Sequence, residues 1–177
     1  MSTEYLSEYG FPFLPAIDFH SEWIKVRAAA KKHPWSNYHG YFDNELSWLR
    51  YCSSMRIANT SWTVRQWKNK DYLDQVYRSR YWLSQLEFTK TLNRRHSSYG
   101  YKHGSENWWR RAQKRLEFSP VRSSYVSNGC LIMAALTLGL NFSNQWEGHC
   151  SLNVALPISE RSLKRLLRDF SDLYYPD

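Results

Sequence analysis

The 177-residue sequence is poor in the residues that build disulfide frameworks, low-complexity regions or membrane spans. Its three cysteines, Cys52, Cys130 and Cys150, are odd in number and form no C-x-x-C pair, which argues against a disulfide framework and a cysteine-based zinc site. Cysteines of this kind favour a reducing, cytoplasmic setting. Seven glycines and six prolines are too few for a disordered, low-complexity chain.

Long apolar runs are also absent. The longest run, Cys130–Leu138, is far shorter than the roughly 20 residues that cross a bilayer, so no membrane association is expected. The first ten residues carry two glutamates and no basic residue, which does not fit a secretory signal peptide. We expect a single compact domain over residues 1–177, in which residues 1–17, with Pro12 and Pro15, form an irregular N-terminal arm.

Aromatic residues are abundant, with nine tryptophans and thirteen tyrosines among the 17% of aromatic positions. In a chain of this kind, most of these rings are expected to fill the core. The remainder are expected at a binding surface, where Trp, Tyr and Arg are the enriched residue types.

Hydrophobic residues recur at helical spacing along most of the chain, which predicts a mostly α fold. Asp18 can accept an orphan backbone N–H and so cap a helix that runs to about Lys32. Further helices are expected over 43–59, opened by Asp43, and over 71–92 and 105–118, with a break at Ser97–Gly100 and Gly104 before the last of these. A short element ending at Trp67 and capped by Thr60 or Ser61, and a last helix from Ser159, are also expected.

The segment from Ser127 to Gly139 predicts the centre of this fold. It is apolar on every side, as helices buried in the middle of a bundle are. Ser127 is a good N-cap and Gly139 a good terminator for a buried helix near 128–138. After it, apolar and polar residues alternate near 151–156, which predicts a short strand.

Positive charge is concentrated in one part of the chain. Residues 62–122 contain fourteen of the 24 Lys and Arg residues but five of the 16 Asp and Glu residues, a local net charge of +9 against +8 for the whole chain. Within this part, residues 93–115 alternate basic and aromatic side chains. Guanidinium and ammonium groups neutralise phosphates, and aromatic rings offer faces on which bases stack.

This block predicts a nucleic-acid or partner-binding site. The alternative is a purely structural role, in which the Arg and Lys residues form a solvated helix face and the tryptophans only anchor the helix. No zinc finger or base-reading code is present, so the shape or backbone of DNA or RNA is the expected target. The candidate cations are Arg94, Arg95, Lys102, Arg110, Arg111, Lys114 and Arg115, and the candidate stacking or anchoring rings are Tyr99, Tyr101 and Trp108.

Other readings of the sequence have thinner support. A helix-turn-helix built from 127–141 and 159–168 would need a turn of three or four residues, whereas about twenty residues separate the pair. His103 and Glu106 would share a helix face and could, with His96 or His149, ligate a metal for nuclease chemistry. His149 and Cys150 could suggest a nucleophilic pair, but adjacent residues rarely face each other in the geometry that such catalysis needs. We therefore expect a non-enzymatic protein with no catalytic residue, no metal and no cofactor.

Two segments carry a resemblance to a known group of proteins. RRHSSYGYKHGSENWW (94–109) and YVSNGCLIMAALTLGLNF (125–142) resemble blocks of small, largely uncharacterised accessory proteins of phages, plasmids and integrated elements. The resemblance implies a mobile-element origin and action on host DNA, RNA or defence complexes, and it supplies no catalytic residues.

Two functional hypotheses follow. In the first, the basic face binds nucleic acid and the protein regulates the DNA or RNA of its own element. In the second, the protein inhibits a host nucleoprotein defence complex, as an anti-CRISPR or anti-restriction factor does, through aromatic and arginine hot spots. The sequence specifies no oligomeric state, because an apolar helix buried in one chain has the same pattern as one buried in a dimer.

Overall fold

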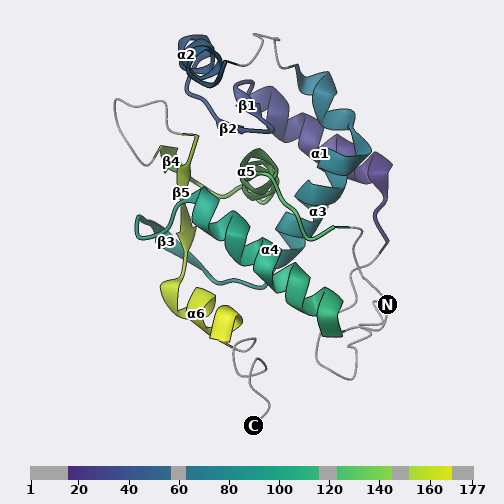
Figure 1. Ribbon diagram of the computed structural model, residues 1–177, viewed down its shortest axis with the longest axis vertical. Helices are drawn as coiled ribbons and strands as arrows, with labels where there is room; N and C mark the ends of the chain where they lie inside the picture. Colours follow the sequence, from purple (N-terminus) through teal and green to yellow (C-terminus); the bar gives the residue numbers. More distant parts are fainter. Residues whose placement is uncertain (1–15, 57–62, 116–122, 145–151, 169–177) are drawn as a thin grey trace.

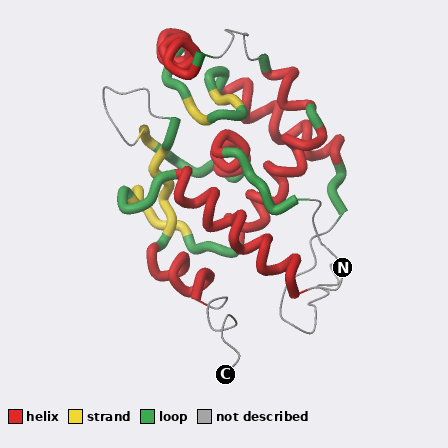
Figure 2. The backbone as a smooth tube through the Cα atoms, in the orientation of Figure 1, coloured by secondary structure: helices red, strands yellow, loops and turns green. Residues whose placement is uncertain are grey.

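The computed structural model describes residues 16–56, 63–115, 123–144 and 152–168, and over these ranges the chain is mostly helical with two short antiparallel sheets (Figures 1 and 2). The helices are α1 (Phe19–Lys32), α2 (Glu45–Met55), the 3-10 helix η1 (Val64–Lys68), α3 (Lys70–Ser84), α4 (Ser98–Arg115), α5 (Asn128–Thr137) and α6 (Glu160–Arg168). The strands are β1 (Ser36–Asn37), β2 (Gly40–Tyr41), β3 (Phe88–Asn93), β4 (Ser143–Asn144) and β5 (Val154–Ile158). The predicted mostly α fold is confirmed.

Helix α5 lies at the centre, seen almost end-on in Figure 1 and surrounded by α1, α3 and α4. All of its residues from 128 to 135 are buried, as its uniformly apolar sequence predicts. The Ser127 side chain accepts a hydrogen bond from the N–H of Cys130 at 3.1 Å, and Gly139 ends the segment with a φ of 71°. The predicted boundaries of this helix are confirmed.

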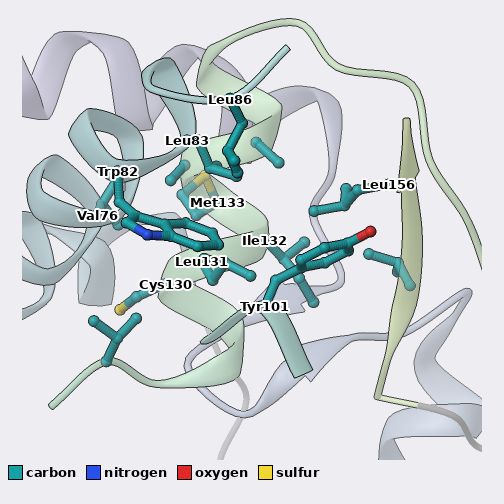
Figure 3. Close-up of a cluster of buried hydrophobic side chains, with 14 of the residues drawn as sticks. Val76, Trp82, Leu83, Leu86, Tyr101, Cys130, Leu131, Ile132, Met133 and Leu156 are labelled. Carbon is teal, nitrogen blue, oxygen red and sulfur yellow. The ribbon is translucent and has the colours of Figure 1, made fainter. Parts of the chain in front are cut away.

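The core packs around α5. One hydrophobic cluster combines side chains of α1, η1, α3, α4, α5, β5 and α6. Figure 3 shows the α5 side chains of Leu131, Ile132 and Met133 between Trp82 of α3 and Tyr101 of α4. A smaller cluster under α2 contains Cys52, which is a buried free thiol, as Cys130 is.

Strand β5 is buried along its whole length and lies between β3 and β4 in a three-stranded antiparallel sheet. Its register pairs Phe88 with Ile158 and Asn144 with Val154. A strand was expected near 151–156, and β5 confirms it with a shift toward the C-terminus. The other edge of β5 pairs with a segment that the sequence pattern assigns to a helix.

That segment is β3, and here the sequence-based prediction of one helix over 71–92 is wrong. Helix α3 ends at Ser84, and its buried Leu73, Val76 and Leu83 keep the predicted spacing. The chain then turns and enters β3, where Thr89 and Thr91 are β-branched residues that suit a strand.

Helix α4 also differs from the prediction, which places a break at 97–100 and a start at 105. The helix begins at Ser98 and continues through Gly100 and Gly104. The N–H of Gly100 donates to the Ser97 hydroxyl at 3.3 Å, which satisfies one orphan donor of the first turn. A Cβ on Gly104 would lie 3.3 Å from the Trp82 ring, so this glycine lets α4 approach α3 closely.

Helix starts follow local capping. Asp18 accepts hydrogen bonds from the N–H groups of His20 and Ser21, which confirms it as the cap of α1. Asn44, rather than Asp43, caps α2, and Thr63 precedes η1. The predicted caps Thr60 and Ser61, the end of the second helix near residue 59 and most of the N-terminal arm lie outside the described residues. Within the described residues, none of the helices combines the length and apolar composition that spanning a bilayer requires.

Candidate nucleic-acid interface

Helix α6 contacts α4 and carries charged residues on its exposed side. Its Leu163 is buried, and its Leu167 lies 4.0 Å from the position that a Cβ on Gly104 of α4 would take. Arg111 of α4 donates from Nη1 to the Leu167 carbonyl at 3.4 Å. The opposite side of α6 exposes four cations: Arg161, Lys164, Arg165 and Arg168.

The turn that follows β3 lies at the start of α6. The side-chain amide of Asn93 donates to the Ile158 carbonyl at 3.1 Å and to the Glu160 carboxylate at 3.2 Å. His96 adds a contact from Nε2 to the same carboxylate at 2.9 Å. These bonds place the exposed Arg94 and Arg95 next to the first turn of α6.

We call the resulting surface the basic face, and it combines three segments far apart in the sequence. It consists of Arg94, Arg95, Arg110, Arg111, Arg161, Lys164, Arg165 and Arg168. Two carboxylates lie in it. Glu87 pairs with Arg165 at 2.9 Å, and Glu160 pairs with Lys164 at 3.4 Å. Among the residues that the structure describes, eight cations against two carboxylates give this face an excess of positive charge.

The α6 part of the basic face borders an open hollow of about 530 Å³. Its described lining residues are Glu160, Arg161, Lys164, Arg165 and Arg168. The hydrogen bond from Asn93 is the main reason that the pKa of Glu160 lies below its ordinary value, with His96 and Lys164 adding to it. Glu160 therefore stays ionised near neutral pH and orders the turn against α6.

The outer side of α4 continues the basic face. Residues seven apart, or three and four apart, share one side of a helix, so Tyr99, His103 and Arg110 form one stripe next to Arg111. Tyr99 is 50% exposed, and the exposed Arg110 is oriented by Asn107, whose side-chain oxygen accepts from Nη1 at 2.6 Å. The candidates Arg94, Arg95, Tyr99 and Arg110 are thus at the surface, and Arg111 is half-buried.

Three other candidates lie inside the protein. Tyr101 is 1% exposed, Trp108 3% and Lys102 6%, so none of them offers a free ring face or a charge to an external ligand. Trp108 packs edge-to-face against Trp109 at 4.6 Å between ring centroids, beneath Tyr81. Tyr101 and Trp108 can therefore anchor α4 in the core, but they cannot stack on a ligand. The side chains of Lys114 and Arg115 lie outside the described part of the structure.

Lys102 belongs to a buried network around Glu106. Glu106 Oε1 accepts from Lys102 Nζ at 2.9 Å and from the N–H of Val126 at 3.0 Å, and Oε2 lies 2.8 Å from His103 Nδ1. Burial alone would raise the pKa of Glu106, but the hydrogen bonds from Lys102, Val126 and His103 outweigh it and hold the pKa below its ordinary value. Glu106 is therefore an ionised group that joins α4 to the segment before α5.

This geometry bears on the alternative sites. His103 and Glu106 share a helix face, because α4 is continuous there, but they bind each other. His96 is engaged with Glu160. Among the described residues, no three His, Cys, Asp or Glu side chains gather closely enough to hold a metal ion. His149 and Cys150 lie outside the described residues.

The helix-turn-helix alternative is wrong. Strands β4 and β5 lie between α5 and α6 in the chain, so no tight turn joins the two helices. The cations of α6 instead join the turn of Arg94 and Arg95 and the outer side of α4.

Sequence reasoning left the α6 cations out of the predicted site. Their common exposed side could be seen in the sequence, but no local pattern tells which helix they lie beside. Comparisons of the chain with models of protein families, with curated proteins and with solved structures give no match.

Proposed function

We propose that this protein is a non-enzymatic nucleic-acid-binding protein that contacts phosphates through the basic face. The observation that carries the proposal is the convergence of the α6 cations, the turn with Arg94 and Arg95, and the arginines of α4 on one side of the molecule. A face of this kind attracts a polyanion and releases its condensed counterions on binding.

The chemistry of the face favours backbone recognition. Seven of the eight cations of the basic face are arginines, and guanidinium groups form charge-assisted bonds with phosphate oxygens. Such contacts position a protein on nucleic acid without reading its sequence. A regulator that coats or sequesters the DNA or RNA of a mobile element needs this type of binding.

Fluorescence anisotropy with labelled DNA and RNA over a salt series tests the proposal. The informative variant is Arg161→Glu with Lys164→Glu, because both side chains are exposed on α6. Each phosphate contact contributes about −0.9 to the slope of log affinity against log salt on duplex DNA. We expect the double variant to bind at least tenfold more weakly and to lose about two units of slope.

A matched control comes from α1. Lys25→Glu with Lys31→Glu makes the same change of charge on exposed residues of a helix far from α6 in Figure 1. The control pair should retain most of the affinity. No binding by the wild type at low salt, or an equal loss in both pairs, would overturn the proposal.

Inhibition of a host nucleoprotein complex is the second candidate function. The observation that favours it is the exposure of large apolar side chains on α2, namely Leu46, Leu49 and Met55. Contiguous exposed apolar side chains are characteristic of protein-binding surfaces, and Leu46 and Leu49, three residues apart, share one side of α2. If this function is correct, Leu46→Asp will abolish capture of the host complex, while the α6 double variant retains it.

A further inference from the structure

Two half-exposed tyrosines from distant parts of the chain meet over one buried cation. Tyr99 of α4 is 50% exposed, and Tyr125, in the segment before α5, is 48% exposed. The ammonium of Lys102 lies 5.4 Å from the centre of the Tyr99 ring and 4.9 Å from that of Tyr125. Because Lys102 is itself buried, the two rings form the outer surface of this pair of cation–π contacts.

The ammonium group between the two rings is held by an ion pair with a buried carboxylate. Lys102 Nζ is paired with Glu106 at 2.9 Å, and the same carboxylate oxygen accepts from the N–H of Val126, the neighbour of Tyr125. The site therefore carries a compensated charge and a fixed link between α4 and the Tyr125 segment.

Each ring has further supports of its own. The hydroxyl of the Tyr125 side chain accepts a hydrogen bond from the Tyr38 hydroxyl at 3.4 Å. The backbone carbonyl of Tyr125 accepts from Arg78 Nη2 at 3.1 Å. The Tyr99 ring meets the His103 ring edge-to-face, with 4.6 Å between centroids. Side chains held by such contacts have less rotamer freedom to lose when a ligand binds.

The pair of tyrosines adjoins the basic face. Tyr99 shares one side of α4 with His103 and Arg110. Arg110 is followed in the chain by Arg111, which donates to the Leu167 carbonyl of α6. A strand whose phosphates follow the arginines can thus bring its bases to the tyrosine rings. Aromatic rings beside a positively charged groove are the arrangement by which proteins bind unpaired strands.

We propose that Tyr99 and Tyr125 stack on unpaired bases, so that the protein prefers single-stranded nucleic acid to duplex. The inference rests on the nucleic-acid binding proposed above and specifies its substrate class. In a duplex each base face is covered by the next base pair, whereas a single strand offers its base faces to protein rings.

The test compares three labelled ligands of equal length in fluorescence anisotropy: oligo(dT), an abasic oligomer with the same phosphates but no bases, and a duplex. The wild type should bind oligo(dT) at least tenfold more tightly than the abasic oligomer, because each stacked base contributes to binding. In Tyr99→Ala with Tyr125→Ala this difference should disappear, while the affinity for the abasic oligomer and its salt dependence stay unchanged.

The matched control is Tyr99→Phe with Tyr125→Phe, which keeps both rings and should retain the preference for oligo(dT). Equal wild-type affinity for oligo(dT) and the abasic oligomer, or tighter binding of the duplex, would overturn the stacking site but leave the basic face standing. That comparison needs no variant to fold. Absence of binding to all three ligands would overturn the basic face, and the stacking site with it.

Discussion

Gly129 lies directly against the backbone of Tyr38. Its N–H donates to the Tyr38 carbonyl at 3.1 Å, and a Cβ at this position would lie 2.6 Å from that carbonyl oxygen and 1.8 Å from the carbonyl oxygen of Asn37. The first turn of α5 therefore packs onto the link between β1 and β2 with no room for a side chain. The close approach of this backbone explains why residue 129 is a glycine, and the neighbouring residues in the sequence do not show it.

We expect Gly129→Ala to destabilise the protein by about 1–3 kcal/mol or more, because backbone atoms, which cannot rotate away, occupy the space of the new methyl group. Urea denaturation followed by circular dichroism measures this loss. A variant as stable as the wild type would show that α5 can shift away from Tyr38.

Gly100→Ala should have the opposite effect. Gly100 is in the first turn of α4, is exposed, and a Cβ there would meet no atom within 4 Å. Alanine reduces the freedom of the unfolded chain, so we expect a gain of about 0.4–1 kcal/mol in the free energy of unfolding. The same denaturation measurement applies, and a loss of stability would mean that α4 begins later than Ser98.

Glu106→Gln should cost stability in a pH-dependent manner. The change removes the charge that compensates buried Lys102, a loss of about 3–5 kcal/mol at neutral pH. Since the folded pKa of Glu106 lies below its unfolded value near 4.5, its contribution is complete above that pH and is lost as the pH falls below it.

The measurement is the free energy of unfolding of the wild type and the Glu106→Gln variant from pH 7 to pH 3. The difference between the two proteins should be largest at pH 7 and should shrink below about pH 4.5. A difference that stays constant over this range would show that the carboxylate charge contributes nothing.

Trp108→Ala should impair folding rather than ligand binding alone. The ring is buried in the core against Trp109, so its loss should cost about 3–5 kcal/mol in the free energy of unfolding. Tyr99→Ala, at an exposed position of the same helix, should cost less than about 1 kcal/mol. Weakened nucleic-acid binding by a fully stable Trp108→Ala variant would return Trp108 to the list of stacking rings.

Much of the architecture could be predicted from local pattern. The cap at Asp18, the buried helix from Ser127 to Gly139 and the strand near 154 follow from capping chemistry and hydrophobic periodicity, which act within a few residues. The strand over Phe88–Asn93 could not be predicted this way, because its conformation depends on pairing with β5, about 65 residues later.

The candidate site also contains residues whose placement could be predicted from the sequence and residues whose placement could not. The inward positions of α4 form a helical pattern, Tyr101, Ser105, Trp108 and Ala112, which would have been visible had the helix been started at Ser98. Gly100 and Gly104 predict a break in the helix, because glycine is unfavourable in helix interiors, and a broken helix does not show this pattern. The buried rings of Tyr101 and Trp108 were therefore among the candidate ligand contacts. Gly104 leaves room for Trp82 of α3, since a Cβ at this position would lie 3.3 Å from the Trp82 ring.

The helical class, the central apolar helix and the positive charge of the chain could be predicted from the sequence, because these depend on composition and on periodicity along the backbone. Which charges share a surface depends on the fold, which brings the α6 cations beside Arg94, Arg95 and Arg111. The fold likewise brings Tyr125 beside Tyr99 over a buried lysine. Such proximity results from packing around α5 and not from any interaction between neighbours in the chain.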